Sequence, residues 1–87
     1  MSELQLKKGF VLKKEKGEWF LCSESGKPYC VLNDSGCFLF GLLKERNMTK
    51  AEMLEELLAN REISTVLALG DIDTFVRLMK QYEIIQE

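Results

Sequence analysis

The first third of the chain alternates between apolar and polar residues with a period close to two, the spacing of half-buried strands. Residues 10–14 and 18–22 are separated by a short turn, in which Gly17 can adopt the positive φ that a tight hairpin needs. After a second turn comes a third segment, residues 28–32, whose Pro28 suits the first position of an edge strand. The pattern predicts a three-stranded antiparallel meander with the second strand in the centre.

From Asn33 onward the apolar spacing lengthens towards 3.6, which predicts helices. Asn33 or Asp34 can cap the first helix, and we expect it to end near Asn47, because asparagine tolerates the left-handed conformation of a C-cap. The second helix starts with a capping box, in which Thr49 accepts from the first turn and Glu52 reaches back. Ser64 or Thr65 would then cap a third helix.

The third predicted helix has its apolar residues at steps of three or four. These are Val66, Leu69, Ile72, Phe75, Val76, Met79 and Tyr82. Three strands followed by three helices predict an α+β fold in which the helices cover one face of a small sheet. With 87 residues, and no repeat, low-complexity stretch or linker, we expect a single domain over residues 1–87.

Charge and hydropathy exclude several classes of function. A formal net charge of -2 gives no overall attraction for phosphate backbones or anionic lipid. The chain has no run near the roughly 20 apolar residues that span a bilayer, and its first residues lack the apolar region of a signal peptide. We therefore expect a cytoplasmic protein that does not bind membranes and for which nucleic acid is a minority hypothesis.

The sequence offers few residues suited to catalysis or to metal or phosphate binding. The three cysteines, Cys22, Cys30 and Cys37, form no CxxC pair, and the chain contains no histidine. This composition predicts no catalytic residue, no metal site and no cofactor, with reduced cysteines that pack as small hydrophobes. Asp71 and Asp73, two residues apart on a helix, lie on different faces and do not form a carboxylate pair. The junction at residues 33–36 lacks the glycines and lysine of a phosphate loop.

The third strand is the more informative feature. Its sequence "PYCVL" has no charged residue after Lys27, and an unprotected edge can accept a strand from another chain. Such an edge also allows homodimerisation. The alternative is that the N-terminal arm or the third helix covers this edge. The pattern alone does not decide between a free edge and a covered one.

Four segments in order and spacing resemble the pyrroloquinoline quinone biosynthesis protein D (PqqD) family. They are "GFVL" at 9–12, "VLNDSGCFLFGLL" at 31–43, "MTKAEMLEELL" at 48–58 and "DIDTFVRLMKQYEII" at 71–85. The resemblance implies a winged-helix-like fold and a peptide chaperone rather than an enzyme. Members of this family and the related recognition elements of ribosomally synthesised and post-translationally modified peptides (RiPPs) bind the leader part of a precursor peptide. They present it to a modifying enzyme, often a radical S-adenosylmethionine protein.

The resemblance also implies where the leader would bind. It would add as a strand beside the third strand and against the third helix, which assigns peptide binding to Tyr29, Cys30, Val31, Leu32, Phe75, Leu78 and Met79. Asn33, Gly36 and Asp71 match family positions that we interpret as structural. Glu83 stands where the family has a glycine after the last helix, so this end is either a continued helix or a different cap.

The competing hypothesis is a winged-helix DNA-binding regulator, in which the second and third helices form a helix-turn-helix and the first hairpin is a wing. Against it, the third helix offers Arg77 and Lys80 but also two aspartates, so contacts with phosphates would be weak. A third hypothesis is an interaction module whose partner is not a RiPP precursor.

Overall fold

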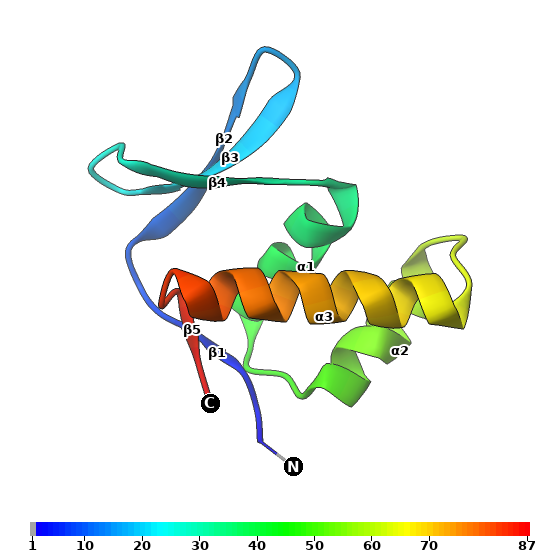
Figure 1. The fold of residues 1–87 in the computed structure, drawn as a ribbon. Helices are drawn as coiled ribbons and strands as arrows, with labels where there is room; N and C mark the ends of the chain where they lie inside the picture. Colours follow the sequence, from blue (N-terminus) through cyan, green and yellow to red (C-terminus); the bar gives the residue numbers. More distant parts are fainter. Residues whose placement is uncertain (1) are drawn as a thin grey trace.

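The predicted meander is present in the computed structural model, which describes residues 2–87. Strands β2 (Phe10–Glu15), β3 (Glu18–Ser23) and β4 (Pro28–Leu32) form an antiparallel sheet in the order β2-β3-β4 (Figure 1). Glu15 pairs with Glu18, so the β2–β3 loop contains only Lys16 and Gly17, whose φ angles are 51° and 82°. Two positive φ values are what a type I′ hairpin turn requires, which confirms the predicted role of Gly17.

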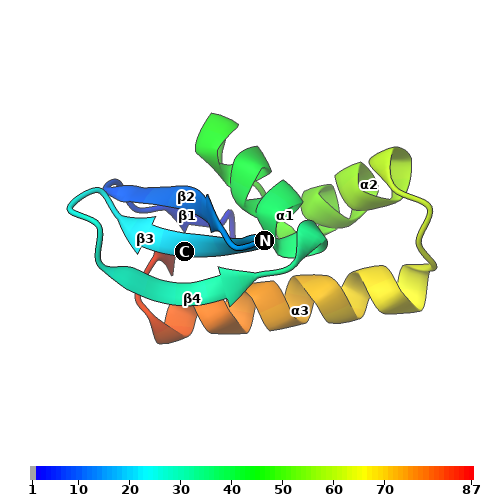
Figure 2. The same cartoon turned by 90° about the horizontal axis from the view of Figure 1, so that it is seen from above.

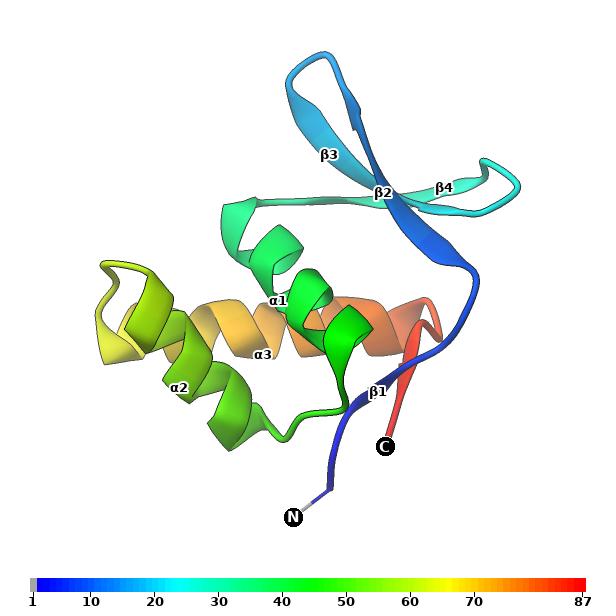
Figure 3. The ribbon, with the colours of Figure 1, turned by 180° about the vertical axis from the view of Figure 1, so that it is seen from behind.

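Three helices follow the sheet: α1 (Asp34–Glu45), α2 (Lys50–Asn60) and α3 (Thr65–Gln81). They pack on the same side of the sheet, and the β2–β3 hairpin projects away from them (Figures 1 and 3). The core lies between α3, the other two helices and the inner face of the sheet. Its most deeply buried side chains include Leu21, Leu39, Phe40, Met53, Leu57, Ile72 and Met79. The predicted α+β fold class, a three-stranded meander followed by three helices, is confirmed.

A second, two-stranded ribbon joins the chain ends, and the sequence pattern did not predict it. Strand β1 (Gln5–Leu6) pairs antiparallel with β5 (Ile85–Gln86), and Leu4 bridges to Met48 with backbone N–O distances of 2.7 and 3.2 Å. Leu4 is only 2% exposed. A strand of two residues is too short to show the alternation of apolar and polar residues from which strands are predicted. This ribbon holds the N-terminal arm away from β4, which removes one of the segments that could have covered that edge.

The capping predictions are confirmed at the starts of the helices. The Asn33 side chain accepts from the Gly36 N–H at 2.7 Å, and Ser64 accepts from the N–H of Leu67. At α2 both halves of the capping box form: Thr49 Oγ1 accepts from the Glu52 N–H, and Glu52 Oε1 accepts from the Thr49 N–H. Each bond satisfies an N–H group that the helix itself leaves without a partner.

Two predictions about the helices are wrong. Helix α1 ends at Glu45 with an extended C-cap, Arg46, so Asn47 is not its left-handed cap. Leaving the helix in the extended conformation leads the chain directly into the Leu4–Met48 bridge. In α3, Val66 and Leu69 were expected in the packing stripe but are 79% and 46% exposed. They lie in the first two turns of the helix, where their side chains remain exposed.

The C-terminus of α3 closes in a Schellman motif. The Ile84 N–H donates to the Met79 carbonyl at 2.8 Å, and the Glu83 N–H donates to the Lys80 carbonyl at 3.0 Å. This pattern requires a left-handed residue after the cap, and Glu83 supplies it with φ 56°. Met79 and Ile84 are both fully buried, as the hydrophobic contact of this motif requires. Of the two alternatives for this end, the helix therefore stops, and a non-glycine residue occupies the glycine position.

Replacing Glu83 with glycine should stabilise the protein. A left-handed conformation costs a residue with a Cβ about 1–2 kcal/mol, and glycine avoids most of this cost. We expect Glu83→Gly to raise the free energy of unfolding by about 1 kcal/mol, or the midpoint temperature by roughly 4–8 °C. Thermal denaturation followed by circular dichroism measures this, with Glu83→Ala as the control that keeps the Cβ. Equal stability of the two variants would contradict the explanation.

Candidate peptide-binding edge

The outer edge of β4 is the candidate site. In residues 2–87 no strand pairs with this side of β4, because β3 lies on its other side and the N-terminal arm pairs with β5. The strand contains no charged residue. It lacks the lysines and acidic residues with which proteins often protect an edge, and among residues 2–87 the element that runs along it is α3.

The pairing register identifies the backbone groups that face outward. Glu15 and Glu18 close a two-residue hairpin and therefore form a hydrogen-bonded pair. Because bonded and non-bonded pairs alternate, the N–H and C=O of Trp19 point to β4, where its partner is Leu32. The next pair, Phe20 with Val31, is then non-bonded. The N–H and C=O of Val31 consequently point to the free edge.

A β-bulge lies just before Val31. Leu21 pairs with Cys30 but Cys22 pairs with Pro28, so Tyr29 is an extra residue on β4. A bulge lets successive side chains turn to the same face and bends the strand. Both Tyr29 and Cys30 pack against the core cluster. The bulge thus directs the Tyr29 ring towards the helices instead of solvent.

Aromatic contacts fix the start of β4 over the end of α3. The Tyr29 ring lies edge-on to Phe10 of β2 at 5.4 Å between centroids, and edge-on to Tyr82, the C-cap of α3, at 5.9 Å. From there β4 runs along α3 in the opposite direction (Figures 1 and 2). The end of β4 therefore lies over the more N-terminal part of α3.

The other end of β4 is fixed by the corner into α1. Asn33 caps the helix, and a Cβ on Gly36 would lie 3.2 Å from Asn33 Oδ1 and 3.3 Å from the Leu32 Cβ. Such distances are tighter than ordinary contact, so glycine lets the helix start directly against the strand. Asn33 and Gly36 therefore both have structural roles at this corner.

The structure separates the residues expected at the site by the exposure of their side chains. Val31 is 45% exposed, and Tyr29, Cys30 and Leu78 are half-buried. Leu32, Phe75 and Met79 are buried in the core. The side chains of these three support the strand and the helix from below and offer little surface to a ligand.

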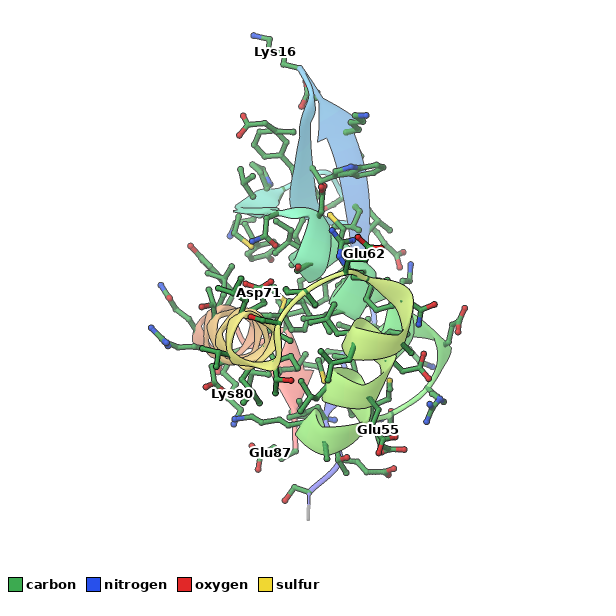
Figure 4. The ribbon with its side chains drawn as sticks, turned by 90° about the vertical axis from the view of Figure 1, so that its right-hand side faces the viewer. Lys16, Glu55, Glu62, Asp71, Lys80 and Glu87 are labelled. Carbon is green, nitrogen blue, oxygen red and sulfur yellow. The ribbon has the colours of Figure 1, made fainter. Side chains whose placement is uncertain are left out.

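Sequence reasoning placed Leu78 in the site and Tyr82 in the core stripe, but it missed that both belong to a second face of α3 beside that stripe. At steps of three or four residues this face carries Leu67, Asp71, Thr74, Leu78 and Tyr82. Tyr82 meets Tyr29 of β4, and Figure 4 shows Asp71 on the side of α3 turned towards the sheet. These residues, which we call the β4-facing stripe, would contact a strand added to β4. Their spacing of three or four residues is present in the sequence, but the apolar residues of the core stripe give the stronger periodic signal.

The thiols near this edge are not activated. Burial raises the pKa of Cys30, and the nearby Cys22 raises it further. Burial also raises the pKa of Cys37, and the Asp34 carboxylate adds to this effect. In residues 2–87, no three Cys, Asp or Glu side chains gather as metal ligands. None of the helices described is long and apolar enough to cross a membrane.

The raised pKa values predict slow alkylation of Cys30 and Cys37. Iodoacetamide reacts with the thiolate, and a raised pKa lowers the thiolate fraction at pH 8. We expect both cysteines of the native protein to react more slowly than the same cysteines in urea, as measured by mass spectrometry of tryptic peptides. Faster labelling of either cysteine in the folded protein would reveal an activated thiol and argue for catalysis.

Two solved structures have a similar fold. One, described as TbiB1 in complex with the TbiA(beta) leader peptide, superposes with a TM-score of 0.69 at 18% identity, over 94% of each chain. The other, described as lasso peptide synthetase B1 complexed with the leader peptide, gives a TM-score of 0.67 at 20% identity, over 99% of this chain and 100% of that one. No protein-family model and no curated protein sequence matches the chain. At such identities the structural similarity establishes the fold.

Proposed function

We propose that this protein binds the leader region of a ribosomally synthesised precursor peptide as a strand added to β4, and presents it to a modifying enzyme. The observation that carries this proposal is the unpaired, uncharged edge of β4 lying along α3. Strand addition supplies main-chain hydrogen bonds from the edge and side-chain contacts from the neighbouring surface. The two similar folds, each described as a complex with a leader peptide, support the same function here.

The proposed family is that of PqqD and the RiPP recognition elements, with residues 1–87 as one peptide-binding domain. In the proposed site Val31 offers its backbone to the peptide, while Tyr29, Cys30 and Leu78 offer partly exposed side chains. Leu32, Phe75 and Met79 form the floor beneath them. The peptide would thus lie between β4 and the β4-facing stripe.

The protein would have no chemistry of its own and no cofactor, and would act in the cytoplasm. The raised pKa values of Cys30 and Cys37 support a binding role, because neither thiol is prepared for nucleophilic attack. The modification would come from a separate enzyme, which we propose to be a radical S-adenosylmethionine protein. In the absence of peptide, the same free edge could pair two copies of the chain as a homodimer.

The charges on α3 argue against the DNA-binding alternative. Lys80 is paired with Glu87, and the Lys50 ammonium lies 3.7 Å from a carboxylate oxygen of Asp73. A recognition helix needs free cations for the phosphate backbone. Here Arg77 is the one α3 cation without an ion-pair partner in residues 2–87.

A proline substitution at Val31 tests strand addition. It removes the outward N–H while leaving the hydrogen bonds between β3 and β4 in place. Using peptides selected from a random display library on the wild-type protein, we expect Val31→Pro to weaken binding by roughly tenfold or more. Isothermal titration calorimetry measures the affinity, and circular dichroism checks that the variant is folded.

Lys14→Pro is the matched control. Lys14 lies on β2, the other edge strand. It pairs with Trp19 next to the hydrogen-bonded Glu15–Glu18 pair, so this pair is non-bonded and the Lys14 N–H also points away from the sheet. We expect its peptide affinity to equal that of the wild type. Unchanged binding in a folded Val31→Pro variant would overturn strand addition at β4. Tight binding of duplex DNA that weakened steeply with salt would favour the regulator instead.

A further inference from the structure

Asp71 is unusual among the acidic residues of this protein. Three acidic side chains, Glu52, Glu56 and Asp71, are partly buried. Glu52 is bonded to Thr49 and Arg46, and Glu56 accepts from the Asn60 amide at 3.4 Å. In residues 2–87 the Asp71 carboxylate has neither a hydrogen-bond partner nor a cation within salt-bridge distance. The expected structural role of Asp71 therefore has no contact to support it.

Asp71 lies beside the path that a strand added to β4 would take. It belongs to the β4-facing stripe and points to the sheet side of α3 (Figure 4). Because β4 starts over Tyr82 and runs towards the N-terminal part of α3, Asp71 lies beyond Leu78 along the path of an added strand. A strand bound there would pass between β4 and Asp71.

A lysine lies at the start of β4, and two acidic residues lie at its end. At the start of β4 the Lys27 ammonium lies 5.5 Å from the Tyr29 ring centroid. At the end of β4 an open depression of about 490 Å³ is lined by residues that include Glu18, Val31 and Asp34. Among residues 2–87 no lysine or arginine lines this depression, although the Lys14 ammonium lies 5.8 Å from the ring centroid of Trp19, which does line it. Two acidic side chains, Glu18 and Asp34, thus lie beside the end of β4, the end nearer Asp71.

Covering Asp71 with a peptide would remove water from a carboxylate that the protein itself leaves unpaired. Leaving such a group buried without a partner is strongly unfavourable. A bound peptide must therefore supply a cation or a hydrogen-bond donor at this point. The same geometry rejects a peptide that places an acidic residue there, because like charges repel in a partly desolvated site.

From this we infer that Asp71 is a specificity-determining residue that selects peptides with a lysine or arginine on the strand added to β4. The inference rests on the proposed function. Asp71 and Leu78 are about 10 Å apart along the helix, at about 1.5 Å per residue. Alternate residues of a strand share a face and are about 6.7 Å apart. The basic residue therefore lies two or four positions from the apolar residue over Leu78, towards the end of β4.

Peptide selection with a charge-reversed variant tests this. A random 12-residue display library is selected separately on the wild type, on Asp71→Lys and on Asp73→Lys. We expect the wild type to enrich lysine or arginine at one position, two or four residues from a conserved apolar one. Asp71→Lys should enrich aspartate or glutamate at that position. Asp73→Lys, on the opposite side of α3, should give the wild-type preference.

Calorimetry with single peptides completes the test. Replacing the basic residue of a wild-type-selected peptide with glutamate should weaken binding to the wild type by roughly tenfold and restore it on Asp71→Lys. If Asp71→Lys does not fold, Asp71→Asn should bind the basic and the glutamate peptides with similar affinity.

Two negative results are distinguishable. In the first, the selected peptides lose binding to Val31→Pro, but either they carry no basic position or Asp71→Lys selects the same basic residue as the wild type. This result would overturn the role of Asp71 and leave strand addition intact. Selected peptides that bind Val31→Pro as well as the wild type would overturn the proposed function and this inference with it.

Discussion

The contact between Tyr29 and Tyr82 sets the relation of the edge strand to α3, on which the candidate site depends. It exists because the bulge on β4 turns Tyr29 to the helix side of the sheet, where Phe10 supports the ring from β2. In a regular strand Tyr29 would point to the other face, because side chains alternate. The start of β4 would then have no aromatic contact with α3. One irregular residue thus links the sheet to the helix.

The opposite end of β4 is held by a different kind of constraint. There the strand passes into α1 within one residue, and Asn33 and Gly36 allow the turn without a loop. A strand fixed at both ends keeps its middle, around Val31, extended and in a constant position. Main-chain groups held in this way would be preorganised for the proposed added strand, so that less conformational entropy would be lost on binding. The residues at the corner act on the site through the backbone, although none of them needs to touch a ligand.

The sequence predicted the elements well where the signal was periodic or local. The meander, the three helices, the capping box at Thr49 and the turn at Gly17 each depend on residues within a few positions of one another. What it did not predict depends on contacts between distant segments. The β1–β5 ribbon joins Gln5 to Gln86, and the bulge at Tyr29 depends on the register with β3. The candidate edge was predicted from its lack of charge, but the outward direction of the Val31 backbone required the observed pairing.

In the proposed mode of binding, β4 and α3 would recognise different features of the peptide. Hydrogen bonds to the Val31 backbone are available to almost any peptide, because every residue except proline has both main-chain groups. Selectivity must therefore come from side chains, and those at the end of β4 offer little, because Leu32 is buried and Val31 is a small apolar residue. The β4-facing stripe instead alternates in chemistry, with Leu67, Asp71, Thr74, Leu78 and Tyr82 in order along the helix. A peptide bound in the proposed way would meet aromatic, apolar, hydroxyl and acidic groups in turn, and this order would distinguish one register and one direction from the others.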